Sequence, residues 1–329
     1  MAGAASVAVV ATLLAGCSIV LLPDNVAKWE QIAGAQAAGT GEAGDPVATP
    51  PLVLDAAGGY LIDATINGQP VRLLVSLRDR GIQLKETAAE RLGITEDSSP
   101  TSIRLGKKKV PGRYATAEVA IGPVRSSPRI EWYDAEVGAG ADGVINIAYL
   151  PFSSVTLNLR PSTDADRWST LPTEDRGGFA VVYRHREGEL NIDVRPDLES
   201  AQTVLTTSTG AFLAERLGGT WTGPDAMYPI VHGIDRPVRP MAFATPLRVG
   251  DFRIDNVLVR LRDYQGDDLL PAYDTGEKED ENTIRVVGET DRTRAAHFLY
   301  LGRDVLGRCA SITYVRETGE LRLLCPPSP

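Results

Sequence analysis

Short stretches of alternating hydrophobic and polar residues run along most of this chain, and they predict a protein built mainly from β-strands. Residues 60–66 alternate in this way. The Asn67-Gly68 pair that follows is the strongest short signal for a hairpin, because both turn positions need positive φ. Residues 71–75 predict the returning strand. Plentiful turn residues (32 Gly and 22 Pro) and an aromatic content of only 6% fit the same all-β interpretation.

The stretch after this hairpin predicts a turn, a short strand and a helix. Residues 76–81 are polar, residues 82–84 form a short apolar run, and a helical pattern over about 86–92 ends at Gly93. The same series recurs later in the chain. The pentapeptide Ala-Glu-Arg-Leu-Gly closes both copies, at 89–93 and again at 214–218, so an internal repeat is predicted.

This order of elements resembles a lobe of the pepsin- and retropepsin-like aspartic proteases. In that family a hairpin strand runs into Asp-Thr-Gly, followed by a short strand and a helix that ends in Leu-Gly. The resemblance implies two pseudo-symmetric β-barrel lobes with short helices. It also implies where the catalytic aspartates should stand: counting back from Leu84 reaches Ser76, and counting back from Leu205 reaches Asp197.

The resemblance and the composition divide the chain into five parts. We interpret 1–17 as a lipoprotein-type signal peptide and 18–51, rich in Ala, Gly and Pro, as a tether. The N-terminal protease-like lobe is expected at 52–161 and the C-terminal lobe at 179–329. The polar segment 162–178 is expected to connect the two lobes.

Both expected catalytic positions depart from the family motif. Ser76 replaces the first aspartate, and Asp197 is followed by Leu-Glu-Ser instead of Thr-Gly-Ala. A hydroxyl facing one carboxylate cannot share a proton as two carboxylates do, so we expect peptide hydrolysis to be lost. Two other aspartates are alternatives to this pair. Asp79, which precedes Arg80-Gly81, is interpreted as part of a charged surface turn, and Asp274, in a literal Asp-Thr-Gly, as part of an acidic loop.

The family carries a flap hairpin over its cleft, and both lobes offer a candidate. Lys107, Lys108 and Lys109 fall at the first flap, although a short charged run is more often a solvated turn. His232 and Gly233 fall at the second. The histidines are not paired at zinc-ligand spacing, so no metal and no cofactor is expected.

The three cysteines divide into two roles. Cys17 follows an apolar run in a sequence that resembles a bacterial lipobox, and its lipidation is expected; an uncleaved signal-anchor and a misassigned start remain alternatives. Cys309 and Cys325 flank two runs, 310–315 and 320–324, that predict a hairpin with the cysteines nearly opposite each other. A disulfide is expected there, with two buried thiols as the alternative.

Charge and export signals limit the partners and the function. The net charge of −9 argues against nucleic acid. We expect a periplasm-facing protein of the bacterial cell envelope, held in the outer membrane by its lipid, that binds an extended peptide or an envelope protein between its lobes. Two alternatives remain: an active aspartic endopeptidase that uses Asp197 with a second carboxylate, and a structural subunit of an envelope complex.

Overall fold

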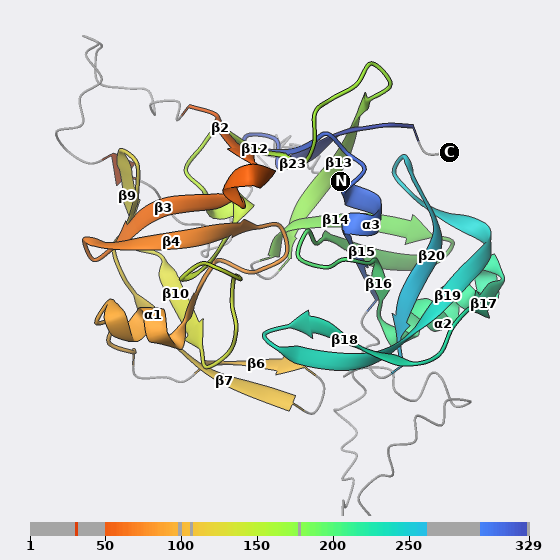
Figure 1. The fold of residues 1–329 in the computed structure, drawn as a ribbon, viewed down its shortest axis with the longest axis horizontal. Helices are drawn as coiled ribbons and strands as arrows, with labels where there is room; N and C mark the ends of the chain where they lie inside the picture. The colour runs from red at the N-terminus through yellow and green to blue at the C-terminus, as the bar shows by residue number, and fades with distance from the viewer. Residues whose placement is uncertain are drawn as a thin grey trace, which may run out of the picture.

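The computed structural model is dominated by β-strands, as the alternation predicts (Figure 1). Only short helices accompany them, and among the residues described no helix has the length and apolar character needed to cross a membrane. The helices are α1 (Glu86–Arg91), α2 (Thr207–Leu217) and α3 (Arg303–Leu306), with the 3-10 turns η1 (Ala56–Gly58) and η2 (Ile147–Tyr149). The structure describes residues 30–31, 50–97, 101–105, 108–176, 179–261 and 297–327.

One sheet gathers most strands of the first half of the chain, residues 50–161. Its strand order is β1-β9-β8-β3-β4-β11-β5-β10-β7-β6. The strands are β1 (Glu30–Gln31), β3 (Leu61–Ile66), β4 (Gln69–Ser76), β5 (Ile82–Lys85), β6 (Thr101–Leu105), β7 (Lys108–Thr116), β8 (Val119–Ile121), β9 (Val124–Ser126), β10 (Arg129–Tyr133) and β11 (Gly143–Asn146).

The other sheet contains the second half, residues 162–327, and two strands of the first. Its order is β17-β19-β20-β16-β21-β15-β14-β13-β23-β22-β12-β2, with β18 paired to β19. The strands are β2 (Leu52–Asp55), β12 (Ser154–Asn158), β13 (Arg167–Arg176), β14 (Phe179–Glu187), β15 (Leu190–Pro196), β16 (Val204–Leu205), β17 (Gly219–Trp221), β18 (Ala226–Val231), β19 (Ile234–Val249), β20 (Phe252–Arg260), β21 (Phe298–Leu301), β22 (Ser311–Val315) and β23 (Glu320–Cys325).

The local predictions around the first hairpin are confirmed. Strands β3 and β4 pair antiparallel, and Asn67 and Gly68 both have positive φ, at 50° and 76°. Helix α1 begins at Glu86, and Gly93 follows it with φ 62°. Strand β4 alternates buried Val71, Leu73 and Val75 with outward-facing residues, so one face of the hairpin enters the core.

The two halves repeat one pattern of strand pairing. In the first half β11 runs parallel to β4 and antiparallel to β5, while β10 runs parallel to β5. In the second half β21 runs parallel to β15 and antiparallel to β16, while β20 runs parallel to β16. Parallel neighbours need a crossover connection, so the same crossover arrangement occurs twice.

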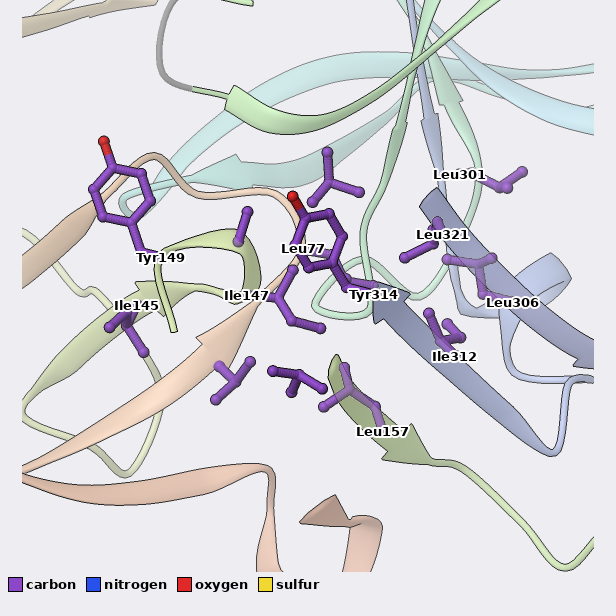
Figure 2. Packing of buried hydrophobic residues seen from close by; sticks show 14 of the residues in the cluster. Leu77, Ile145, Ile147, Tyr149, Leu157, Leu301, Leu306, Ile312, Tyr314 and Leu321 are labelled. Carbon is purple, nitrogen blue, oxygen red and sulfur yellow. The ribbon is translucent and has the colours of Figure 1, made fainter. Parts of the chain in front are cut away.

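Both halves contribute to one shared part of the second sheet. Strands β2 and β12 of the first half pair with each other, and β12 pairs with β22 of the second. Figure 2 shows Leu77, Ile147, Leu157, Ile312 and Tyr314 pointing toward one another beneath this junction, and all belong to one buried cluster. The halves are therefore joined by an apolar core as well as by backbone hydrogen bonds.

Two segments interpreted from composition contain strands. The expected connection 162–178 includes β13, which pairs with β23 and β14. Within the expected tether 18–51, β1 pairs with β9. Strand β13 was not predicted because one of its faces is exposed and its residues are mostly polar. Cys17 lies outside the described residues.

The predicted disulfide between Cys309 and Cys325 is present and closes the β22–β23 hairpin at its open end.

We predict that replacing both cysteines by serine lowers the free energy of unfolding by about 2–4 kcal/mol. The disulfide joins residues 16 positions apart, and without it the unfolded chain gains the conformational freedom that this loop had removed. Urea unfolding of the oxidised protein measures the loss. Wild-type protein unfolded in reductant should match the variant; a variant as stable as the oxidised wild type contradicts the prediction.

Candidate functional site

The first half of the site is a tight turn at the end of β4. The Ser76 hydroxyl accepts hydrogen bonds from the backbone N–H groups of Arg78 (3.2 Å) and Asp79 (3.1 Å). A side-chain oxygen that accepts from the residues two and three positions ahead folds the backbone into a compact turn. Residues 76–79 thus form a compact turn at the end of β4.

The second half of the site repeats this turn at the end of β15. One carboxylate oxygen of Asp197 accepts from the backbone N–H groups of Glu199 (2.9 Å) and Ser200 (3.0 Å). Asp197 therefore has the same local role as Ser76. By this correspondence Glu199 is the counterpart of Arg78, and the two turns differ in chemistry while sharing one backbone design.

The two turns face each other, and Arg78 crosses between them. Its guanidinium lies 2.9 Å from the Asp197 carboxylate, 3.1 Å from Glu199 and 3.4 Å from Asp79. The Ser76 hydroxyl lies 2.9 Å from a Glu199 oxygen and 3.0 Å from an Asp79 oxygen. We call these five side chains the charged cluster. It joins the halves through a cation from one and carboxylates from both.

Burial makes the electrostatics of the charged cluster strong. The side chain of Asp197 is 4% exposed and that of Asp79 6%, whereas Glu199 keeps 31%. Burial lowers the pKa of Arg78, but the carboxylates of Asp79, Asp197 and Glu199 raise it by more, so the guanidinium stays charged. Burial raises the pKa of Asp79, but the Arg78 charge and the hydrogen bonds to Glu199 and Ser76 lower it overall.

Glu199 holds the shared proton of the cluster. Burial, and then repulsion from Asp79, raise its pKa to about 7 despite the opposing charge of Arg78. Its carboxyl group is hydrogen-bonded to that of Asp79. One carboxyl from each half therefore forms a pair in which Asp79 is ionised and Glu199 is mostly protonated below about pH 7.

A hairpin of the second half reaches over the cluster into the first half. The Arg78 guanidinium donates to the Ile230 carbonyl of β18 at 3.2 Å. Beyond the turn at His232 and Gly233, where φ is 51° and 65°, Ile234 packs with Val110 and Tyr133 of the first half. The hairpin tip thus occupies the space between the halves next to the charged cluster.

His232 lies at this tip without joining the hydrogen-bonded cluster. Its ring stands 5.2 Å from that of Tyr133, measured between centroids. Burial lowers its pKa, an effect that the Asp79 charge opposes, so the imidazole is neutral near pH 7. His232 therefore acts at the tip as a ring that packs against Tyr133.

Asn146 braces the first turn from behind. It ends strand β11, and its side chain is fully buried. Its amide donates to the Asp79 carbonyl at 2.6 Å and its oxygen accepts from the Ala148 N–H at 2.9 Å. The Asn146 side chain thus holds the Asp79 turn in place.

The structure brings Ser76 and Asp197 into one cluster and corrects the interpretation of Asp79. We expected Asp79 in a charged surface turn, yet its residue is 5% exposed. The prediction was wrong because the turn faces Asp197 and Glu199 of the other half, which local pattern does not reveal. Arg78 and Glu199 were missed for the same reason. The available signal was the opposite charge at the third position of the two equivalent turns.

The remaining predicted site residues lie elsewhere or outside the described part. Gly233 is exposed at the hairpin tip. Lys107 and Asp274 lie outside the described residues. Lys108 and Lys109 are the first two residues of β7, and only their backbone is described. In the described parts of the chain, no group of three or more His, Cys, Asp or Glu side chains is arranged to hold a metal ion.

Neither a protein-family model nor a curated protein sequence matches this chain. The charged cluster is therefore interpreted from its own geometry.

We predict that Arg78→Met lowers the free energy of unfolding at pH 7 by about 3–5 kcal/mol, because Asp79 and Asp197 stay buried without their cation. Arg322→Met is the control: Arg322 is 47% exposed in its pair with Glu320, and its loss should cost less than about 1 kcal/mol. Chemical denaturation measures both. Equal small losses would show that the cluster does not hold the halves together.

The raised pKa of Glu199 makes stability depend on pH. Its ordinary value of 4.5 rises to about 7 in the folded protein, so the native state binds more protons between these values and stability falls as pH rises through this window. We predict that wild type loses about 1–3 kcal/mol relative to Glu199→Gln between pH 4.5 and 7.5, a range that allows for its partial exposure. Denaturant titrations measure the difference. The exposed Glu317→Gln should retain the wild-type slope; a Glu199→Gln slope like that of wild type contradicts the assignment.

Proposed function

We propose that this chain is an exported, membrane-anchored protein of the pepsin- and retropepsin-like fold that has lost peptide hydrolysis and binds an extended peptide or protein segment between its two lobes. The repeated strand pairing and the matching turns at Ser76 and Asp197 support this fold assignment. The disulfide fits an oxidising compartment such as the periplasm.

The contact of Arg78 with Asp197 is the main reason for proposing that peptide hydrolysis is lost. An aspartic protease needs two carboxylates that share a proton and a water. Here the position opposite Asp197 belongs to the Ser76 hydroxyl, and the Arg78 guanidinium lies 2.9 Å from the Asp197 carboxylate. The Arg78 guanidinium occupies the Asp197 carboxylate at this distance, so the carboxylate is not free to hold a water together with a second acid.

Two free strand edges support peptide binding. Among the strands described, β6 pairs only with β7 and β18 pairs only with β19, so each presents one row of unpaired backbone groups. Val110 of β7 contacts Ile234 beside the β18–β19 turn, and Figure 1 shows the two hairpins on the same side of the molecule. An extended peptide that adds as a strand to the β18 edge lies near the charged cluster, because the Ile230 carbonyl of β18 accepts a hydrogen bond from Arg78.

The tip of the β18–β19 hairpin, at His232 and Gly233, lies in the path of a peptide that enters between the halves. Its contacts with Tyr133 and Arg78 fill the space between the halves. A peptide that enters the cleft has to displace the tip, and its affinity is reduced by the free energy of that step.

A second candidate function rests on Asp79 and Glu199. This pair shares a proton across the halves with one member ionised, which is the electrostatic arrangement that acid hydrolysis uses. In this alternative Glu199 serves as the acid and Asp79 as the base, and Asp197 supports the turn. Arg78, which contacts both carboxylates, argues against it because it draws Asp79 into an ion pair.

Incubating the full chain in mild detergent with a mixed peptide library from pH 3 to 7 separates the two functions. We expect peptides to be retained and recovered uncut, as mass spectrometry of bound and free fractions would measure. Ile234→Ala should increase retention several-fold, because it weakens the packing of the hairpin tip in the closed cleft.

Cleavage that Asp79→Asn and Glu199→Gln each abolish, but that Glu317→Gln leaves unchanged, would replace the first proposal by the second. Absence of both retention and cleavage, including in Ile234→Ala, would reject both.

A further inference from the structure

We propose that the outer face of the shared sheet binds a linear, neutral oligosaccharide along a row of side chains from Trp168 to Asp55. This inference is independent of the proposed peptide cleft, because it uses a different surface. The row is set by backbone register: Trp168 pairs with Leu324, Leu324 with Ser311, Ser311 with Asn158 and Asn158 with Asp55.

Alternation places all these side chains on one face. In β23 the buried positions are Leu321, Leu323 and Cys325, so Leu324 points to the other side. In β12 the buried Val155 and Leu157 likewise leave Asn158 on the outer face. Cross-strand partners point to the same side of a sheet. The row therefore crosses five strands, and its four intervals span about 19 Å.

A hollow lies at the Asp55 end of the row. Its volume of about 470 Å³ falls within the range of small-molecule sites, roughly 300–1,000 Å³. The turn η1 and the segment that follows β12 form its sides. Four members of the row line it, namely Asp55, Asn158, Ser311 and Leu324.

Trp168 supplies an aromatic surface at the other end of the row. The residue is 60% exposed, although a tryptophan buries a large apolar area when it packs. Its cross-strand partner on this face is the half-buried Leu324, and the row continues beyond Leu324 with the polar residues Ser311, Asn158 and Asp55. A flat ring at one end of a row that carries hydroxyl, amide and carboxylate groups toward its other end suits a chain of sugar rings, each of which presents an apolar C–H face and a polar rim.

The polar groups of the row favour a neutral ligand. Asp55 accepts from the Asn158 amide at 2.8 Å, which leaves carboxylate lone pairs for ligand hydroxyl groups. The cation that lines the hollow, Arg160, is held by Asp166 at 2.5 Å and by the Arg308 carbonyl at 2.8 Å. An anionic ligand thus meets a carboxylate and an engaged arginine, whereas a polyhydroxylated ligand finds donors and acceptors of both kinds.

The outer face also differs from a peptide-binding edge. Strands β13, β23, β22 and β12 are each paired on both sides, so their backbone groups are not available for an added strand. Thr156 and Thr313 bond to each other at 2.9 Å in the next row. The surface consequently offers side chains rather than backbone, and a straight row fits an extended chain of sugar rings.

Titration of the full chain in mild detergent with chitotetraose and, separately, cellotetraose tests the proposal. We expect at least one of the two to change the tryptophan fluorescence in a saturable way. Trp168→Ala should weaken that binding by about tenfold or more, measured by isothermal titration calorimetry. Asp55→Ala should weaken it as well, by removing a hydrogen-bonding group at the hollow.

Trp221→Ala is the matched control, because Trp221 is 38% exposed but lies on β17 at the far end of the sheet. Circular dichroism shows whether each variant is folded. No binding of either tetrasaccharide to wild type at 10 mM would overturn the proposal. Binding that Trp168→Ala leaves unchanged, or that Trp221→Ala weakens equally, would also overturn it. Peptide retention is not affected by these outcomes, so the two proposals fail separately.

Discussion

A guanidinium buried between two halves of a protein is tolerated only where carboxylates surround it, and Arg78 meets this requirement with groups from both halves. Removing a charge from water costs several kcal/mol, and ion pairing offsets that cost only when the geometry is close. Contacts of 2.9 Å to Asp197 and 3.1 Å to Glu199 provide it. Since Asp197 and Glu199 come from the other half, Arg78 forms these two ion pairs only when the halves are correctly closed. The cluster thus specifies one relative position of the halves, while the apolar core beneath it supplies most of the stabilisation.

The two turns have the same backbone hydrogen bonds although their side chains differ. A single oxygen that accepts two backbone N–H groups forms each turn, and a serine hydroxyl performs this as well as an aspartate carboxylate. In the aspartic proteases the same carboxylate oxygen atoms have a second role, because catalysis also requires them to share a proton and hold a water. Folding therefore places a weaker constraint on these positions than catalysis does. The two carboxyl groups whose pKa values move in opposite directions here are Asp79 and Glu199, which lie beside the two positions that the resemblance implies.

The binding surfaces that we propose follow from how the sheets end and what they leave exposed. Strands β6 and β18 are edges in the described structure, so backbone groups are the available contact there. The shared sheet is paired across its middle, so only its side chains can meet a ligand. The strand edges suit a peptide because they present backbone donors and acceptors. The face of the second sheet suits a polyhydroxylated chain because it presents polar side chains instead.

Local pattern in the sequence was enough for features whose partners are close along the chain. The hairpin at Asn67-Gly68, helix α1, its end at Gly93 and the Cys309–Cys325 pairing all depend on neighbours or on a short hairpin, and all were predicted. The positions equivalent to Ser76 and Asp197 were also found, because spacing to the next strand is a local property. Strand β13 was hidden, since half of its residues face solvent and read as a polar connection.

Only the tertiary structure decided which charges are buried. Two partners of Arg78, Asp197 and Glu199, stand 119 and 121 residues away along the chain, so no short window of sequence contains both members of either ion pair. Asp79 looked like a solvated residue because charged side chains usually are, and its burial arises from a turn of the other half packed against it. Sequence by itself determined where the chain turns and which residues enter the core. The meeting of Arg78, Asp79, Asp197 and Glu199 was determined by the closure of two halves, because burial and pKa depend on what lies nearby in space.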